Sequence, residues 1–187
     1  MQELIKNIEQ WAEDRNIING SKPIDQAMKL FSEFGELADN VGKGRDCRDD
    51  IGDCAVVMTI IMAQCGLSFY DYSESMLMSN YEMKYNVACL ASEIAEFVSD
   101  IASNGVIESD SYIMVIGWLN TISSNANTTL EECVQIAYNE IKDRKGVMYN
   151  GVFIKESDPA YQDALDNIEA DKRMASQKRI SVNIEDL

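Results

Sequence analysis

Apolar side chains recur every three or four residues along most of the chain, which is the period of an amphipathic helix. Only two prolines interrupt the pattern, and they stand where helices are expected to begin. In the first half we expect helices over residues 2–17, from residue 22 to the break at 42–44, over 46–64 and over 69–83. Ser21 is the expected N-cap of the second helix. The fold class that this pattern predicts is all-α.

The second half of the chain is similar to the first. Residues 90–97 match residues 30–37 at an offset of 60, and residues 112–125 match the apolar helix at 51–64 at an offset of 61. We therefore expect an internally duplicated, four-helix-bundle-like protein, although chance similarity between amphipathic helices is an alternative explanation. The expected divisions are a first helical repeat at 1–83, a degenerate second repeat at 84–157, and a charged C-terminal helix and tail at 158–187.

The end of the second repeat carries local signals of its own. Thr129 and Glu132 form a capping box, which predicts a helix start there. A helix is expected to continue to Gly146, with cations in its last turn. Asn150-Gly151 then predicts a turn within 147–156, in either a short hairpin or an extended arm.

Two pairs of carboxylates stand three residues apart inside the first repeat. Glu33 and Glu36 lie in the second expected helix, and Asp50 and Asp53 lie at the start of the third and most apolar helix. Each pair projects from one face of its helix, so antiparallel packing would bring four carboxylates together. A hard divalent cation would neutralise their repulsion. The pattern predicts a metal site for Mg²⁺, with Mn²⁺ as an alternative.

The second repeat keeps only half of this arrangement. Glu93 and Glu96 stand where the first pair does, but Ser111 and Met114 occupy the positions of Asp50 and Asp53. Glu93 and Glu96 are therefore interpreted as a solvated helix face.

The amino-acid composition excludes several classes of partner and catalytic mechanism. The chain has 32 Asp and Glu residues against 16 Lys and Arg, which argues against a partner such as duplex DNA or an anionic membrane. It has no histidine, which removes catalytic triads and imidazole metal sites. Its five cysteines form no CxxC pair and lie mostly in apolar runs, which is typical of a reduced cytoplasmic protein. The longest apolar run, 55–63, is too short to span a bilayer.

Several residues are candidates for contacting an anionic substrate. The cations lie in two loops, Lys43 and Arg45 in the first and Lys142, Arg144 and Lys145 in the second. Each set would meet phosphate oxygens that a metal does not hold, but solvated turns and helix capping are alternatives. Trp11 could stack on a nucleobase, although its helical spacing also suits a core residue.

At the acidic helices the sequence resembles the MazG-like, all-α nucleotide pyrophosphatase superfamily, which includes the dimeric dUTPases, dCTP pyrophosphatase and phosphoribosyl-ATP pyrophosphatase. Residues 32–38, Ser-Glu-Phe-Gly-Glu-Leu-Ala, are like its E-E-x-G-E-L signature, and residues 50–53, Asp-Ile-Gly-Asp, are like its ExxD motif. Residues 139–146 and 150–153 resemble the end of phage-type members and add Asn139 to the substrate-binding candidates. Ser32 and Asp50 depart from the usual glutamates.

The resemblance implies Mg²⁺-dependent hydrolysis of a nucleoside triphosphate to a monophosphate and pyrophosphate. Glu33, Glu36, Asp50 and Asp53 would be both the metal ligands and the catalytic groups, and one glutamate would accept the proton of the attacking water. It also implies a homodimer or higher homo-oligomer. Two alternatives remain: a nucleotide-binding protein that has lost hydrolysis, and a helical adaptor whose acidic faces are only solvated.

Overall fold

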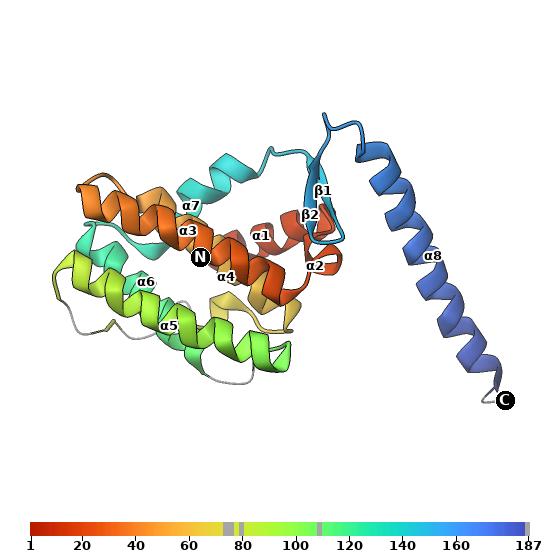
Figure 1. Ribbon diagram of the computed structural model, residues 1–187, viewed down its shortest axis with the longest axis horizontal. Coiled ribbons are helices and arrows are strands. Elements are labelled where there is room, and N and C mark those ends of the chain that lie inside the picture. The colour runs from red at the N-terminus through yellow and green to blue at the C-terminus, as the bar shows by residue number, and fades with distance from the viewer. Residues whose placement is uncertain (73–76, 79–80, 108–109, 186–187) are drawn as a thin grey trace.

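The computed structural model is predominantly helical (Figure 1). It describes residues 1–72, 77–78, 81–107 and 110–185, with side chains as far as Ser176. The predicted all-α class is therefore confirmed, apart from one small two-stranded sheet. No helix in these described residues is long and apolar enough to cross a membrane.

The predicted helix at 2–17 is two helices, α1 (Gln2–Asp14) and α2 (Ile17–Gly20). Asn16 interrupts them with a left-handed backbone at φ 58°, and its side-chain amide donates to the Met148 carbonyl at 2.9 Å. Asparagine adopts this conformation at low cost, and here the long-range hydrogen bond holds it.

Two long helices, α3 (Pro23–Lys43) and α4 (Arg48–Gln64), pack against each other as expected. The prediction of Ser21 as the N-cap of α3 is wrong: the cap is Lys22, whose backbone N–H donates to the Asp25 carboxylate at 2.8 Å. The Ser21 hydroxyl instead donates to the Ile17 carbonyl at 2.8 Å, at the end of α2. The predicted break after α3 is confirmed.

The predicted helix at 69–83 is wrong in its described part. A single 3₁₀ turn, η1 (Phe69–Tyr72), is followed by non-helical backbone at 77–78 and 81–82; residues 73–76 and 79–80 lie outside the described part. The buried Asn86 side chain exchanges two hydrogen bonds with the Tyr81 backbone, at 3.1 and 3.2 Å. These bonds satisfy polar groups that a helix would otherwise use.

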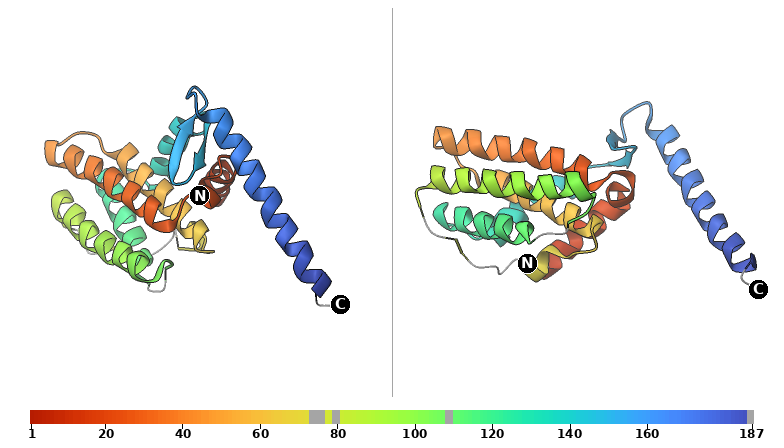
Figure 2. Two further views of the ribbon diagram at one scale, coloured as in Figure 1. Left: turned by 45° about the vertical axis from the view of Figure 1, so that its right-hand side comes forward. Right: turned by 60° about the horizontal axis from the view of Figure 1, so that its bottom comes forward.

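The second half supplies α5 (Met83–Asn104), α6 (Ser111–Asn125) and α7 (Leu130–Ile141). The capping box of α7 is confirmed, with reciprocal hydrogen bonds of 3.1 and 3.2 Å between Thr129 and Glu132. α4 packs between α3 and α7, and α5 packs between α3 and α6 (Figure 2). One hydrophobic cluster includes side chains from both predicted repeats.

Beyond α7 the backbone changes character. The helix ends at Ile141, so the expectation of cations in its last turn is wrong: Lys142, Arg144 and Lys145 follow the helix. The hairpin alternative is confirmed, with β1 (Gly146–Tyr149) antiparallel to β2 (Val152–Lys155). Asn150 and Gly151 form its two-residue turn at φ 50° and 78°, as a hairpin of this length requires.

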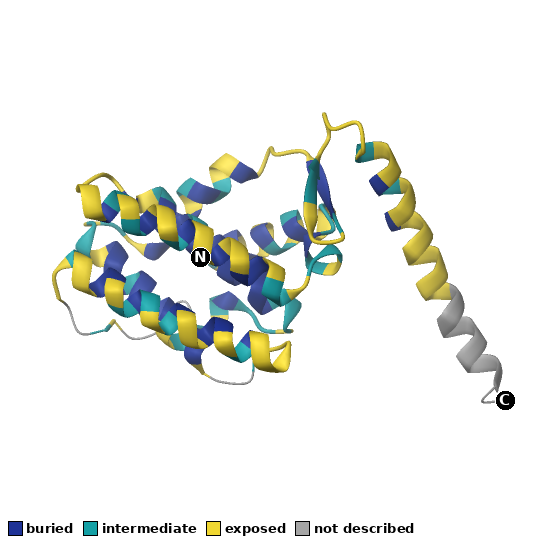
Figure 3. Cartoon of the chain, in the orientation of Figure 1, coloured by how far each residue is buried: buried dark blue, intermediate teal, exposed yellow. Residues whose placement is uncertain are grey.

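The predicted exposed C-terminal helix is confirmed as α8 (Tyr161–Glu185). Ala164 and Ile168 bury themselves against Val147 of β1 in a small second cluster, whereas the rest of the described surface of α8 is mostly exposed (Figure 3). The helix continues to Glu185, so it includes residues in which we expected a tail. All five cysteines are free thiols, as predicted.

Candidate active site

The predicted carboxylates lie on neighbouring faces of α3 and α4. Glu33 and Asp50 are buried at 7% and 8% exposure, Asp53 is half-buried, and Glu36 is exposed one turn along α3. Burial of Glu33 follows from its place in the apolar stripe of α3, which includes Leu30 and Leu37. Glu33, Asp50 and Asp53 therefore border the core, whereas Glu36 lies on the surface.

The buried Cys54 thiol of α4 is influenced by all four predicted acids. Cys54 of α4 has its pKa raised well above the usual value, first because it is buried and then because Glu33, Asp53, Asp50 and Glu36 all disfavour the thiolate. All four predicted carboxylates therefore act on the same part of α4.

Asp53 is the most perturbed carboxyl of the group. Burial, followed by the charges of Glu33 and Asp49, raises its pKa from 3.8 to about 7, while Lys29 and Arg144 act in the opposite direction. Asp50 is also shifted upward, first by burial and then by Glu33. Negative charge therefore exceeds positive charge at the centre of the cluster.

Two of the acids have partners in the chain. The Lys29 ammonium pairs with Glu33 one turn away on α3, and the Asn40 side-chain amide donates to Asp50 at 2.9 Å. The oxygen of that same amide accepts from Arg45 at 3.5 Å, which places the predicted cation Arg45 one residue removed from Asp50.

Two acids of this cluster were not found from the sequence. The pKa of Asp49 is raised by burial and then by Glu140 of α7, and Arg144 lowers it. Asp49 is next to Asp50, so it could have been included in the predicted site from the sequence alone. Glu140 could not, because only the packing of α7 on α4 brings it near. Lys29 and Asn40 were also missed, although each lies a helical turn from a predicted ligand.

The five predicted cations occupy different positions. Arg144 acts on the charges of Asp49 and Asp53, so it faces the cluster. Lys43 pairs with Asp39 at 2.6 Å and Lys145 with Glu156 at 3.5 Å, both on the surface. The structure therefore brings Arg144 and, through Asn40, Arg45 toward the acids. Lys142 is also exposed and donates to Asn139 at 3.1 Å.

The two remaining candidates lie on α1 and α7. Asn139 is exposed and accepts hydrogen bonds from Gln135 and Lys142. Trp11 packs half-buried against the core, and the Arg15 guanidinium lies 4.9 Å from the centre of its ring. Arg15 also donates to the Arg144 carbonyl at 2.7 Å and to the Lys142 carbonyl at 3.2 Å. Their proposed roles with substrate remain predictions.

The donor set fits a hard divalent cation. All the acids offer oxygen, which Mg²⁺ and Mn²⁺ prefer. One buried oxygen, Oδ1 of Asp49, has no hydrogen-bond partner, and a buried acceptor without a partner is costly. In the described part of the chain, no three Asp, Glu or Cys side chains are already arranged as a metal-binding group. Glu33 and Asp50 would have to exchange their present partners for the ion.

Comparison with known proteins gives one partial match. The chain is 54% identical over 66 residues to an uncharacterized 18.2 kDa protein in the rep-hol intergenic region of Haemophilus phage HP1 (strain HP1c1). The match covers 34% of this chain and 40% of that protein, so the chain spans less than half of the relative's length. No protein-family model and no solved structure matches.

The raised pKa of Asp53 predicts how stability depends on pH in the metal-free chain. Between pH 3.8 and about 7 the folded state keeps a proton that the unfolded state has released, so the free energy of unfolding should fall as pH rises through this window. After allowance for solvent screening, we expect a loss of about 1–2 kcal/mol. Urea unfolding with EDTA at a series of pH values measures it.

Asp53→Asn is the matched variant for this measurement. It should remove most of the fall, because the asparagine carries no charge at any of these pH values. Parallel profiles for the native chain and the variant would show that Asp53 is not the group responsible.

Proposed function

We propose that this protein is a Mg²⁺-dependent nucleoside triphosphate pyrophosphatase with an internally duplicated MazG-like bundle. The observation that carries the proposal is the convergence of Glu33, Asp50 and Asp53, with Asp49 beside them, at a site with excess negative charge. A protein keeps such a costly arrangement where the acids have a cation to bind. A hydrolase of this kind would act in the cytoplasm, where its substrates are dissolved.

The reaction adds water across the bond between the α-phosphorus and the α,β-bridging oxygen. The water oxygen bonds to the α-phosphorus, its proton passes to a carboxylate, and the bridging oxygen leaves with pyrophosphate. The bound Mg²⁺ would supply charge neutralisation for the triphosphate. Glu33 is our candidate to accept the proton, since its charge acts on both Asp50 and Asp53 at the centre of the cluster.

The neighbouring cations complete the proposed pocket. Arg144 faces the acids from beyond the end of α7, where its guanidinium would hold phosphate oxygens that the metal does not reach. Arg45 approaches from the loop after α3. Between them the two side chains would fix the triphosphate against the acidic faces of α3 and α4.

A second candidate function is nucleotide binding without hydrolysis. Lys29 and Asn40 occupy two of the predicted ligands, Glu33 and Asp50, in the described structure. Ser32 also stands in place of the first acid of the family signature. A protein that sequesters a nucleotide would need the cations but not a complete set of metal ligands.

Pyrophosphate release distinguishes these functions. The chain is incubated with each canonical nucleoside triphosphate and deoxynucleoside triphosphate, with Mg²⁺, with Mn²⁺ or with EDTA. We expect release from at least one substrate, and its loss with EDTA. A thermal shift caused by a nucleotide without pyrophosphate release would favour sequestration. The absence of both a thermal shift and pyrophosphate release would favour the helical adaptor.

A further inference from the structure

In the part of α8 whose side chains are described, residues 161–176, only the beginning packs against the rest of the protein. Its 25 residues extend from Tyr161 to Glu185, about 37 Å at the helical rise. Ala164 and Ile168 pack against β1, but every described residue from 169 to 176 is exposed, and the helix projects from the bundle (Figures 1 and 3). A helical stretch without packing partners is only marginally stable in water, so the projecting part calls for a partner.

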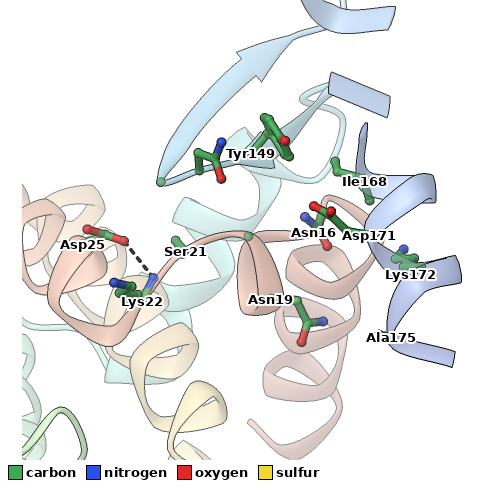
Figure 4. A pocket seen from close by; sticks show the side chains of 13 residues that line it. Asn16, Asn19, Ser21, Lys22, Asp25, Tyr149, Ile168, Asp171, Lys172 and Ala175 are labelled. Atoms are coloured by element: carbon green, nitrogen blue, oxygen red, sulfur yellow. Dashed lines mark hydrogen bonds between the residues drawn. The ribbon is translucent and has the colours of Figure 1, made fainter. Parts of the chain in front are cut away.

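Among the described residues, the protein's own surface does not pack against this part of the helix. A cleft of about 780 Å³ separates the middle of α8 from α2, the start of α3 and the hairpin turn (Figure 4). Its walls combine polar and apolar surface, and the charged side chains among them are Lys22 and Asp25 on the body and Asp171 and Lys172 on α8. None of the carboxylate cluster lines this cleft, so it is separate from the candidate active site.

The charges of α8 are divided into two blocks. Residues 163–171 contain four acids and no cation, and residues 172–184 contain four cations and no acid. The acids are Asp163, Asp166, Glu169 and Asp171, and the cations are Lys172, Arg173, Lys178 and Arg179. In a chain of net charge −16, the second block is an exceptional concentration of positive charge.

We propose that α8 pairs antiparallel with the α8 of a second copy of this chain. Reversing the direction of one helix places the acidic block of each beside the basic block of the other, whereas a parallel pair would oppose like charges. The pairing is two-fold symmetric and uses the same surface on both copies, so it closes as a dimer. The competing intrahelical pair between Arg173 and Glu169 is exposed on both sides and contributes little.

A polyanion such as single-stranded nucleic acid is the main competitor for the basic block. The net charge of the chain opposes it, because the whole body would be repelled by the phosphates that attract one half of α8. A second α8 supplies both signs of charge in the matching order. This difference favours self-pairing, and nucleic-acid binding becomes one outcome of the test.

Sedimentation velocity from 1 to 100 μM protein, in 50 and 500 mM NaCl, tests the pairing. The native chain should form dimers in low salt and bind itself at least tenfold more weakly in high salt. Both K172E/R173E/K178E/R179E and D163K/D166K/E169K/D171K should be monomeric, because each gives the two blocks the same sign of charge. An equimolar mixture of the two variants should form a mixed dimer, which a variant with an unfolded α8 would not do.

The matched control changes the same amount of charge elsewhere. K6E/K84E reverses two exposed cations outside α8 and should leave dimer formation unchanged, whereas K172E/R173E should weaken it at least tenfold. A native chain that stays monomeric at every concentration in both salts overturns the proposal. So does a mixture that fails to associate, or a monomer that binds a labelled single-stranded oligonucleotide through the basic block.

Discussion

Replacing Asp53 with asparagine should abolish turnover while leaving the protein folded. The asparagine keeps the shape of the side chain but cannot carry the charge that the proposed cation needs, so we expect kcat to fall about 10³-fold. Pyrophosphate release at saturating Mg²⁺ and nucleotide measures the loss. The substrate would still meet Arg144 and Arg45, so nucleotide-induced thermal shifts should be reduced but not eliminated.

Stability is the companion measurement for Asp53→Asn. At pH 8 the native aspartate is ionised at a half-buried position against neighbouring negative charge, since its pKa is about 7. The asparagine variant should therefore unfold at equal or higher urea concentration in EDTA. Lower activity with undiminished stability is characteristic of a functional residue.

The second repeat offers a matched control for this experiment. Glu93 stands at the position that corresponds to Glu33, but the second repeat has Ser111 and Met114 at the positions of Asp50 and Asp53. Glu93→Gln should leave turnover unchanged. If Asp53→Asn retained full turnover, Asp53 would be removed from the mechanism and the proposed metal site would lose its central ligand.

Gly52→Ala should cost about 3 kcal/mol in the free energy of unfolding. A β-carbon at Gly52 would lie 2.7 Å from the carbonyl carbon of Cys133 and 2.9 Å from the β-carbon of Ala137, both on α7. Helix backbone cannot move aside as a flexible side chain can, so α7 would be pushed away from α4. Urea denaturation of both chains measures the difference.

The same substitution should also reduce turnover in the population that remains folded, because α7 positions Glu140 and leads directly to Arg144. Gly35→Ala is the control. Gly35 lies in the exposed middle of α3 with no neighbour within 4 Å of an added β-carbon, so alanine should be neutral or gain about 0.5–1 kcal/mol. Equal free energies of unfolding for Gly52→Ala and the native chain would contradict this prediction. They would show that α7 can move to accept the added β-carbon.

The sequence was sufficient for the parts of the site that depend on local periodicity. Glu33 and Asp50 are buried because they fall within apolar helical stripes, and such stripes can be read from spacing alone. The hairpin at Asn150-Gly151 and the capping box at Thr129 are also local signals, and both are confirmed.

The parts that could not be predicted depend on contacts between distant segments. Glu140 reaches the cluster only because Gly52 lets α7 approach α4 closely, and no local pattern shows that approach. The expected helix at 69–83 fails for a related reason, since Asn86 takes up the backbone groups of Tyr81. In both places a tertiary interaction outweighs local preference.

The hydrogen bonds of Arg15 give the beginning of the chain an unexpected influence over the proposed chemistry. This side chain fastens α1 to the backbone at Lys142 and Arg144, up to 129 positions later in the sequence. The Arg144 guanidinium, which we propose binds substrate phosphates, is therefore positioned through a second arginine, Arg15, that binds the backbone on either side of it. Truncating the first helix, or fusing another protein to it, would loosen these hydrogen bonds. We therefore expect such a change to lower substrate affinity before it lowers solubility.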